Sequence, residues 1–195
     1  MSGASSASPG AMEAELIGGV EKRAIIIADY DPSWPAKFEM HRNAIAAALG
    51  ATTLRIEHVG STAVPRLAAK PIIDILLVVK DSANESAYLP PLEAAGYVLR
   101  VREPDWNEHR MLRTPGKDVH VHVYSAGCLE IDRNLSFRDH LRAHAQDRQR
   151  YEETKRTLAR IDWPDMNAYA AAKTEVIESI LTAARAAAAG RTPSE

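Results

Sequence analysis

The segment EHVGSTAVPRLAAKPIIDILLVV, Glu57–Val79, decides the fold of this chain. Alternating side chains over residues 55–59 predict a strand, and the Gly-Ser-Thr sequence that begins at Gly60 ends it. The run from Pro71 to Val79 is the most apolar and β-branched of the chain. Such a run predicts a strand in the interior of a sheet. A single carboxylate, Asp74, lies within it.

Outward from this segment, strands and helices are mixed in the first part of the chain, and helices follow. Residue patterns predict further strands over 23–28, 97–102, 108–114 and 118–124, and helices over 35–49, 89–95, 134–145, 147–160 and 166–188. We expect residues 64–69 to form a loop or a short helical turn, and Pro115-Gly116 to join two strands. The predicted fold class is therefore α/β (α+β): a mixed β-sheet flanked by helices, with a C-terminal helical segment.

Length, composition and charge bound the class of protein. The 195 residues suit one domain, which we place over residues 23–188, between a mobile tail (1–22) rich in Ser, Ala and Gly and a frayed end (189–195). A net charge of −2 indicates no basic surface for nucleic acid. The single cysteine, Cys128, excludes an intrachain disulfide. Because no secretory signal or membrane-spanning run is visible, we expect a cytoplasmic protein with no membrane partner.

Asp74 is a candidate catalytic and metal-binding residue because it interrupts an apolar strand. By alternation it shares a face with Leu76 and lies opposite Ile73. A carboxylate in such a strand is either ion-paired or bound to a cation, since burying it alone is costly. Metal-assisted phosphoryl or nucleotidyl transfer needs an acid that holds a divalent ion such as Mg²⁺ or Mn²⁺. The structural alternative is an ion pair of Asp74 with Lys70 or an arginine.

Gly60 and Ser61 offer a phosphate site next to that acid. A Gly-Ser pair directly after a strand forms a tight turn with exposed N–H groups and a hydroxyl. Such a turn can cradle a phosphate. The structural alternative is an ordinary turn without a ligand.

Two histidines on a later predicted strand form a candidate metal-binding and catalytic pair. His120 and His122 alternate with valines, so both imidazoles share one face while the valines face the core. Imidazole suits a transition metal such as Zn, Mn or Fe better than Mg. A histidine can also act as a general base near neutral pH. The alternative is a polar strand face that is hydrogen-bonded to its neighbours.

The predicted C-terminal helices place tyrosines beside lysines. Tyr151 and Lys155 are four residues apart, as are Tyr169 and Lys173, so each pair lies on one helix face. A tyrosine beside a lysine suits a nucleobase or ribose with its phosphates. The structural alternative is a lysine whose stem covers a half-buried tyrosine while its amine stays in water.

Longer motifs carry a family resemblance across nearly the whole predicted domain. They are YDPSWPAKF (30–38), IEHVGSTAVPRLAAKPIIDI (56–75), EHRML (108–112), DVHVHV (118–123), LSFRDHLRAH (135–144), YEETKRTLA (151–159) and YAAAKTEVIESI (169–180). With these motifs the chain resembles the GrpB family, a branch of the nucleotidyltransferase superfamily. The resemblance implies a mixed sheet flanked by helices and a nucleotidyltransferase activity. A similar domain is fused to dephospho-CoA kinase in some bacteria, where a folding-accessory role has been proposed.

Together with the resemblance, these patterns give a candidate set of phosphate- or nucleotide-binding residues: Gly60, Ser61, Thr62, Lys70, Arg110, Arg138, Lys155 and Lys173. The superfamily pattern places two acids two residues apart, whereas here Ile72 and Leu76 stand on either side of Asp74. The later strand offers two histidines where the third acid is expected, and Arg66 stands where the family commonly has glycine. These departures weigh against ordinary two-Mg²⁺ chemistry.

We therefore expect a metal-dependent nucleotidyltransferase that moves an NMP from an NTP to a small acceptor. Asp74 would hold the cation, the Gly60-Ser61 turn would bind the β- and γ-phosphates, and basic residues would neutralise the leaving pyrophosphate. His120 or His122 would serve as the base. Two alternatives stay open. One is a catalytically impaired nucleotide-binding, folding-accessory or protein-interaction module of the same fold, and the other is a His/Asp metal site that carries out hydrolysis.

Overall fold

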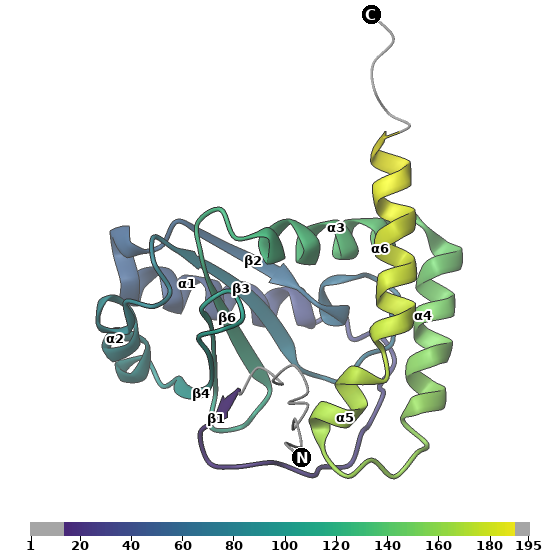
Figure 1. Ribbon diagram of the computed structural model, residues 1–195, viewed down its shortest axis with the longest axis horizontal. Coiled ribbons are helices and arrows are strands. Elements are labelled where there is room, and N and C mark those ends of the chain that lie inside the picture. The colour runs from purple at the N-terminus through teal and green to yellow at the C-terminus, as the bar shows by residue number, and fades with distance from the viewer. Residues whose placement is uncertain (1–13, 190–195) are drawn as a thin grey trace, which may run out of the picture.

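The computed structural model describes residues 14–189 of the chain. Over these residues a mixed sheet of six strands has the order β1-β4-β5-β6-β3-β2 (Figure 1). The strands are β1 (Glu15–Leu16), β2 (Arg55–Val59), β3 (Ile73–Val79), β4 (Val98–Glu103), β5 (His109–Arg113) and β6 (Val119–Ser125). Neighbouring strands are antiparallel except β3 and β6, which are parallel. The predicted α/β class with a mixed, helix-flanked sheet is confirmed.

Strand β3 is paired along both edges, as its apolar sequence predicts. On one side β2 runs antiparallel and places Val59 opposite Asp74. On the other side β6 runs parallel and places His120 opposite Asp74 and His122 opposite Leu76. Side chains that are level with each other in adjacent strands project from the same face of a sheet. The register therefore puts Asp74 and both histidines on one face.

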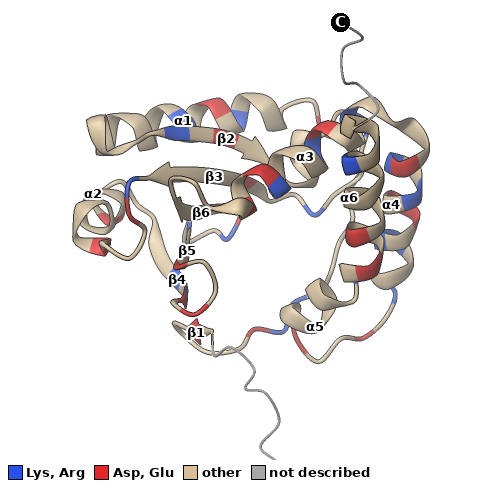
Figure 2. Ribbon diagram, turned by 45° about the horizontal axis from the view of Figure 1, so that its top comes forward, with Lys and Arg blue, Asp and Glu red and all other residues tan. Residues whose placement is uncertain are grey.

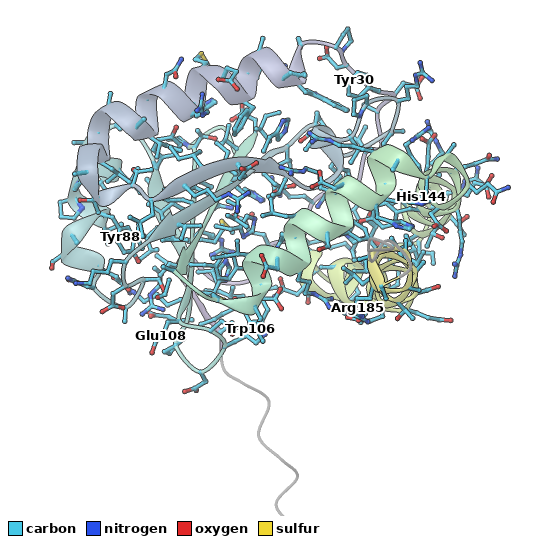
Figure 3. All side chains as sticks on the ribbon, turned by 90° about the horizontal axis from the view of Figure 1, so that it is seen from above. Tyr30, Tyr88, Trp106, Glu108, His144 and Arg185 are labelled. Carbon is cyan, nitrogen blue, oxygen red and sulfur yellow. The ribbon has the colours of Figure 1, made fainter. Side chains whose placement is uncertain are left out.

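The opposite face of β3 and β6 packs against α1 (Trp34–Leu49) and α2 (Leu89–Ala94) and forms the main hydrophobic core. Ile73, Ile75 and Leu77 of β3 lie in this core together with the valines of β6. Figure 3 shows α1 along this face, whereas α3 (Leu129–Ala143), which follows β6 in the chain, lies on the other side of the sheet. Burying an aliphatic side chain stabilises the fold by about 1.5–3 kcal/mol. The alternation of valine with histidine in β6 and the single carboxylate of β3 therefore fix which face of these strands meets α1.

In the described part of the chain, α3 begins a segment of four helices that continues with α4 (Ala145–Leu158), α5 (Met166–Ala171) and α6 (Thr174–Ala189). Figure 1 shows this helical segment, α3–α6, beside the sheet, with α6 extending past the rest of the molecule. Its helices meet the turn after β2 in one apolar cluster, where Val64 and Leu67 pack with Leu141, Tyr151 and Ile180. The cluster fixes the helical segment against that turn.

The helix predicted over residues 166–188 is in fact two helices. The side chain of Asp165 caps α5 and accepts hydrogen bonds from the backbone N–H groups of Asn167 and Ala168, both at 2.8 Å. Helix α5 ends before Lys173, and α6 begins directly after it. Because neither glycine nor proline marks the break, residue periodicity does not reveal it.

The strand predicted over residues 23–28 is wrong. Strand-like pairing there is limited to one antiparallel bridge between Ala28 and Ala69, with both N–H···O distances at 2.9 Å. The rest of the segment pairs with no strand of the described sheet, and Ile26 is 65% exposed. The three consecutive isoleucines favour a strand, but a strand forms only where a neighbouring strand pairs with it, and this segment has none in the described sheet.

The first described residues lie against the sheet, although they fall within the predicted tail. Residues 15–16 form β1 and pair with β4, and the guanidinium of Arg100 donates hydrogen bonds to the carbonyls of Ile17 and Gly19. The rest of the predicted tail and end, residues 1–13 and 190–195, lies outside the described residues. Short 3₁₀ helices occur at Gly50–Thr52, Ser61–Ala63 and Glu85–Ala87. Between residues 14 and 189 no helix is long and apolar enough to cross a membrane.

Candidate metal centre

A cavity of about 610 Å³ lies between the sheet and the helical segment. Most of the predicted site residues line it: Gly60, Ser61, Thr62, Lys70, Asp74, His120, His122, Lys155 and Lys173. Figure 2 shows that β2 ends and β3 begins on the side of the sheet that faces the helical segment. The turn after β2 and the first residues of β3 therefore open directly into the cavity.

Asp74, His120 and His122 form a compact cluster at the start of β3 and on β6. The Oδ1 atom of Asp74 lies 3.6 Å from Nδ1 of His120 and 3.6 Å from Nε2 of His122. One ligand atom from each residue lies within 4.8 Å of the other two. Among the described residues, the basic side chains within 4 Å of the Asp74 carboxylate are these two histidines, and neither Lys70 nor an arginine is among them. The structural alternative proposed from the sequence is therefore absent.

The cluster keeps its carboxylate ionised. Burial favours the neutral acid, but the two imidazoles beside the carboxylate outweigh the effect of burial. They hold the pKa of Asp74 well below its usual range. At neutral pH Asp74 is therefore an anion at the wall of the cavity, and its side chain keeps 29% of its surface exposed.

One imidazole of the cluster lacks the hydrogen bonds that a structural role would supply. The Nε2 atom of His120 is buried and has no hydrogen-bond partner among the described residues. Buried polar atoms are nearly always paired. One carboxylate and two imidazoles, with Nδ1 of His120 and Nε2 of His122 facing Asp74, fit a divalent metal ion, because imidazole and carboxylate are common ligands of such ions. Asp74, His120 and His122 are the residues that would hold it.

Gly60 lets the turn approach this carboxylate. Its φ of 69° and ψ of −170° lie in a region that glycine adopts and other residues avoid. A Cβ atom at this position would overlap Oδ2 of Asp74 and lie 3.0 Å from its Cβ atom. The glycine therefore serves both the turn geometry and the close packing of the turn on the cluster.

Ser61 and Thr62 of the same turn have different surroundings. The Oγ atom of Ser61 accepts a hydrogen bond of 3.1 Å from Nζ of Lys155, which comes from α4. The Thr62 side chain is buried, and its hydroxyl donates to the carbonyl of Ile72 at 3.0 Å. It also lies 3.0 Å from Nε2 of His58. Ser61 therefore presents its hydroxyl to the cavity beside an amine, whereas the Thr62 hydroxyl holds the turn in place.

Three lysine amines converge on the cavity from separate elements. The Nζ atoms of Lys70 and Lys173 lie 5.2 and 4.8 Å from the ring centre of Tyr169. The Nζ atom of Lys155 lies 4.7 Å from the ring centre of Tyr151 and also donates to the carbonyl of Ala68. Among the described residues none of the three amines is ion-paired with a carboxylate. The cavity thus holds positive charge that an anionic ligand would neutralise.

Burial makes these amines weaker bases. Burial, with the repulsion of Lys173, lowers the pKa of Lys155 to about 7 and that of Lys70 to about 8. Burial also lowers the pKa of Lys173, against the attraction of Asp74. An anion bound among the three amines would restore their charge, because an opposite charge favours the protonated form.

Replacing Lys155 with methionine should stabilise the ligand-free protein at pH 6 and less so at pH 10. The charged groups near Lys155 are Lys70, Lys173, Glu152 and Arg156. Between pH 7 and 10.5 the unfolded chain binds more protons than the folded one at this lysine, so the cost of burying the charge is full below pH 7 and fades as pH rises. Each kcal/mol relieved should raise the melting temperature by about 2–4 °C. Thermal denaturation across this pH range measures the difference.

The exposed Lys80 supplies the matched control, because its replacement with methionine should leave the pH dependence unchanged. A Lys155→Met effect that is the same at pH 6 and pH 10 would show that the lysine is not a buried charge.

Arg110 and Arg138, both predicted to bind phosphate or nucleotide, are not brought to the cavity. The Nε atom of Arg110 donates to Glu85 at 2.7 Å, and its guanidinium also contacts Glu108. Arg110 lies on the face of β5 opposite His109, which does line the cavity. Arg138 donates to Glu57 at 2.8 Å and to the carbonyl of His58. In this structure both arginines hold structural ion pairs.

His109 and Glu103 also line the cavity, and neither is among the site residues predicted from the sequence. The Nε2 atom of His109 lies 3.1 Å from Nδ1 of His122, and Nδ1 of His109 lies 2.6 Å from the Glu103 carboxylate. Alternation within EHRML could have indicated His109, because it places His109 and Met111 on one face and Arg110 on the other.

The fold and the site define an α/β protein whose sheet presents an Asp-His-His cluster to a lysine-lined cavity. The chain belongs to the GrpB family, since the family model described as GrpB protein matches residues 24–183. It is 51% identical over 163 residues to a UPF0157 protein of Halalkalibacterium halodurans, with 84% of each chain covered. The crystal structure of conserved protein GrpB from Enterococcus faecalis is similar with a TM-score of 0.73 and 34% identity, over 82% of this chain and 96% of that chain.

A similar region also occurs in a longer protein. A dephospho-CoA kinase of Mycolicibacterium paratuberculosis is 32% identical over 169 residues, which cover 73% of this chain and 42% of the kinase. The GrpB resemblance and its link to a domain of dephospho-CoA kinases are therefore confirmed.

Proposed function

We propose that this chain is a metal-dependent nucleotidyltransferase, related to the nucleotidyltransferase superfamily, that transfers an NMP from an NTP to a small acceptor. The observation that carries the proposal is the convergence of two kinds of group in one cavity. A cluster suited to a divalent cation, Asp74 with two histidines, lies beside three lysine amines without carboxylate partners and a Gly-Ser turn. A cation site next to unneutralised amines suits a polyphosphate chain.

Different residues of the cavity would contact different parts of such a substrate. Ser61 and Lys155, which are hydrogen-bonded to each other, are placed to bind a phosphate oxygen. Lys70 and Lys173 are placed to neutralise the charge that develops on the leaving pyrophosphate. Both amines contact the buried ring of Tyr169, which holds them in place. A divalent ion held by the cluster would polarise a phosphoryl oxygen as a Lewis acid.

The donor set favours a transition metal over Mg²⁺. Mg²⁺ is usually held by carboxylates and water, whereas imidazole suits Zn²⁺, Mn²⁺ or Fe²⁺. The position where a second acid of a two-Mg²⁺ centre would stand, Leu76, is fully buried and packs with Val59 and Tyr124. A second carboxylate on that side of Asp74 would therefore disrupt an apolar cluster.

The same observation supports a second candidate, a nucleotide-binding module without transferase activity. A single carboxylate supports one cation, and two-metal transferases use more than one acid. Such a module would bind a nucleotide in the cavity and act through a protein partner, which is the kind of accessory role implied by the resemblance.

Nucleotide-dependent stabilisation tests the proposal. ATP, GTP, CTP and UTP are each added with Mg²⁺, Mn²⁺ or Zn²⁺, and the melting temperature is measured. We expect at least one NTP to stabilise the protein only when a divalent ion is present, by about 2.7 kcal/mol at a hundredfold excess over its Kd. The Lys173→Ala variant should lose this stabilisation, and the exposed Lys80→Ala variant should keep it.

Pyrophosphate release then separates the two candidates. Release with a pool of small acceptors supports transfer, whereas metal-dependent stabilisation without release supports the nucleotide-binding module. An absence of stabilisation by every nucleotide and metal would contradict both and leave binding of a protein partner.

A further inference from the structure

Three side chains form a hydrogen-bonded row that starts at His122 and leads away from Asp74. His122 Nδ1 lies 3.1 Å from His109 Nε2, and His109 Nδ1 lies 2.6 Å from the Glu103 carboxylate. The three residues come from neighbouring strands, β6, β5 and β4. At the other side of the His122 ring, Nε2 faces Oδ1 of Asp74 at 3.6 Å.

The chemistry of the row sets the direction of its hydrogen bonds. A carboxylate has only acceptor oxygens, so Nδ1 of His109 carries a proton and donates it to Glu103. The Nε2 atom of a neutral His109 then has a lone pair, which accepts from the Nδ1–H group of His122. In a neutral His122 ring this arrangement places the proton on Nδ1, which leaves the lone pair of Nε2 directed toward Asp74.

Two electron-rich atoms, Nε2 of His122 and Oδ1 of Asp74, therefore face each other across the cluster. At 3.6 Å these two atoms are too far apart for a hydrogen bond, but they are close enough for their lone pairs to repel each other. A cation between them would turn this repulsion into attraction. The row thus prepares His122 to act as a ligand before any metal ion arrives.

Packing prevents the imidazole ring of His109, the middle residue of the row, from rotating. His109 is 5% exposed, and its ring lies nearly parallel to the rings of His122 and Tyr124, with ring centres at 5.3 and 4.8 Å. The ring of Trp106, labelled in Figure 3, makes a T-shaped contact with His109 at 5.4 Å between ring centres. A ring held in this way keeps both of its nitrogens aligned with their partners.

We propose that His109 and Glu103 are positioning residues of the metal centre, which hold His122 with its Nε2 atom free for the cation. The proposal rests on the metal site of the proposed function and requires nothing of the nucleotide. Outer partners of metal-binding histidines fix the ring orientation, fix which nitrogen carries the proton and raise the basicity of the ligand atom.

Titration of the metal-free, full-length protein with Co²⁺ tests this role. Co²⁺ serves as a probe because its visible absorption reports both its affinity and its ligand geometry. We expect His109→Phe, which keeps a stacked ring but loses both nitrogens, to weaken Co²⁺ binding by about 10–100-fold and to change the spectrum. His109→Gln should recover part of the affinity, since its amide oxygen can accept from Nδ1–H of His122.

Two further variants complete the design. Glu103→Gln keeps an acceptor oxygen but removes the charge, so we expect a smaller loss than with His109→Phe. His41→Phe is the matched control, because His41 lies on α1 and outside the cavity lining, where it is hydrogen-bonded to Tyr97. Its loss should not affect Co²⁺ binding. Melting of each metal-free variant shows whether it folds.

The outcomes are distinct. Unchanged Co²⁺ affinity and spectrum in folded His109→Phe would overturn the positioning role while leaving the metal site intact. Equal losses in His109→Phe and His109→Gln would overturn it as well, because the acceptor atom would then not matter. Failure of the wild-type protein to bind Co²⁺, Zn²⁺ or Mn²⁺ would contradict the metal site itself.

Discussion

Replacing Asp74 with asparagine should abolish divalent-cation binding and the metal-dependent stabilisation by nucleotide. Asparagine has nearly the same shape but no negative charge, and Asp74 is the carboxylate of the Asp-His-His cluster. Loss of an outer positioning residue alone costs about 10–100-fold in metal affinity. Loss of a direct ligand that carries charge should exceed this range. Metal content after equilibrium dialysis and isothermal titration of the metal-free protein measure the effect.

The control for this variant is Asp105→Asn, because Asp105 is exposed and lies outside the cavity lining. It should bind metal as the wild-type protein does. Retention of full metal affinity by folded Asp74→Asn would show that the cation is held elsewhere in the molecule.

Replacing Gly60 with alanine should both destabilise the fold and impair the metal centre. The backbone conformation at Gly60 costs a non-glycine residue roughly 1–3 kcal/mol. The added methyl group would also overlap Asp74, and such overpacking typically costs about 1–3 kcal/mol more. Together we expect a loss of about 3 kcal/mol and a fall in melting temperature of roughly 6–12 °C. Urea unfolding and Co²⁺ titration measure the two effects.

Gly127→Ala separates backbone strain from overlap with the cluster. Gly127 also has a positive φ, 83°, but a Cβ atom there would meet nothing within 4 Å. We expect a moderate loss of stability and normal metal binding. Equal stability losses in the two variants, with metal affinity intact in both, would mean that Gly60 serves the turn and not the approach to Asp74.

Most of the fold follows from residue patterns that are local. The apolar run of β3, the alternating valines of β6 and the helix that ends before Gly50 are each readable without knowledge of their neighbours. The errors occur where neighbours decide. Residues 23–28 have strand propensity but no continuous partner, and the break at Lys173 has no glycine or proline to mark it.

For the candidate site, too, the sequence predicts the features that depend on a single strand and not those that depend on how strands pair. Alternation placed Asp74 on one face of its strand and both histidines on one face of theirs, but it could not show that β3 and β6 are adjacent and parallel. That pairing is a property of the whole sheet. Arg110 belongs to a motif, EHRML, that correctly indicates the family. Its side chain nevertheless points toward Glu85 and away from the cavity, which the motif alone does not reveal.

The positions of His109 and Glu103 also depend on how the strands pair, so the sequence alone did not predict them as site residues. His109 acts through His122, and this contact depends on the register between β5 and β6. Glu103 is reached through a further strand, β4. Outer partners of a metal ligand therefore become visible once three strands are placed together.

An anomalous difference map from crystals grown with Zn²⁺ tests the central claim most directly. The account predicts one strong peak inside the cluster, within bonding distance of the Asp74 carboxylate, an imidazole nitrogen of His120 and Nε2 of His122, with Zn–N distances of about 2.0–2.1 Å. An empty cluster at saturating Zn²⁺, or a peak whose ligands do not include Asp74, would contradict it.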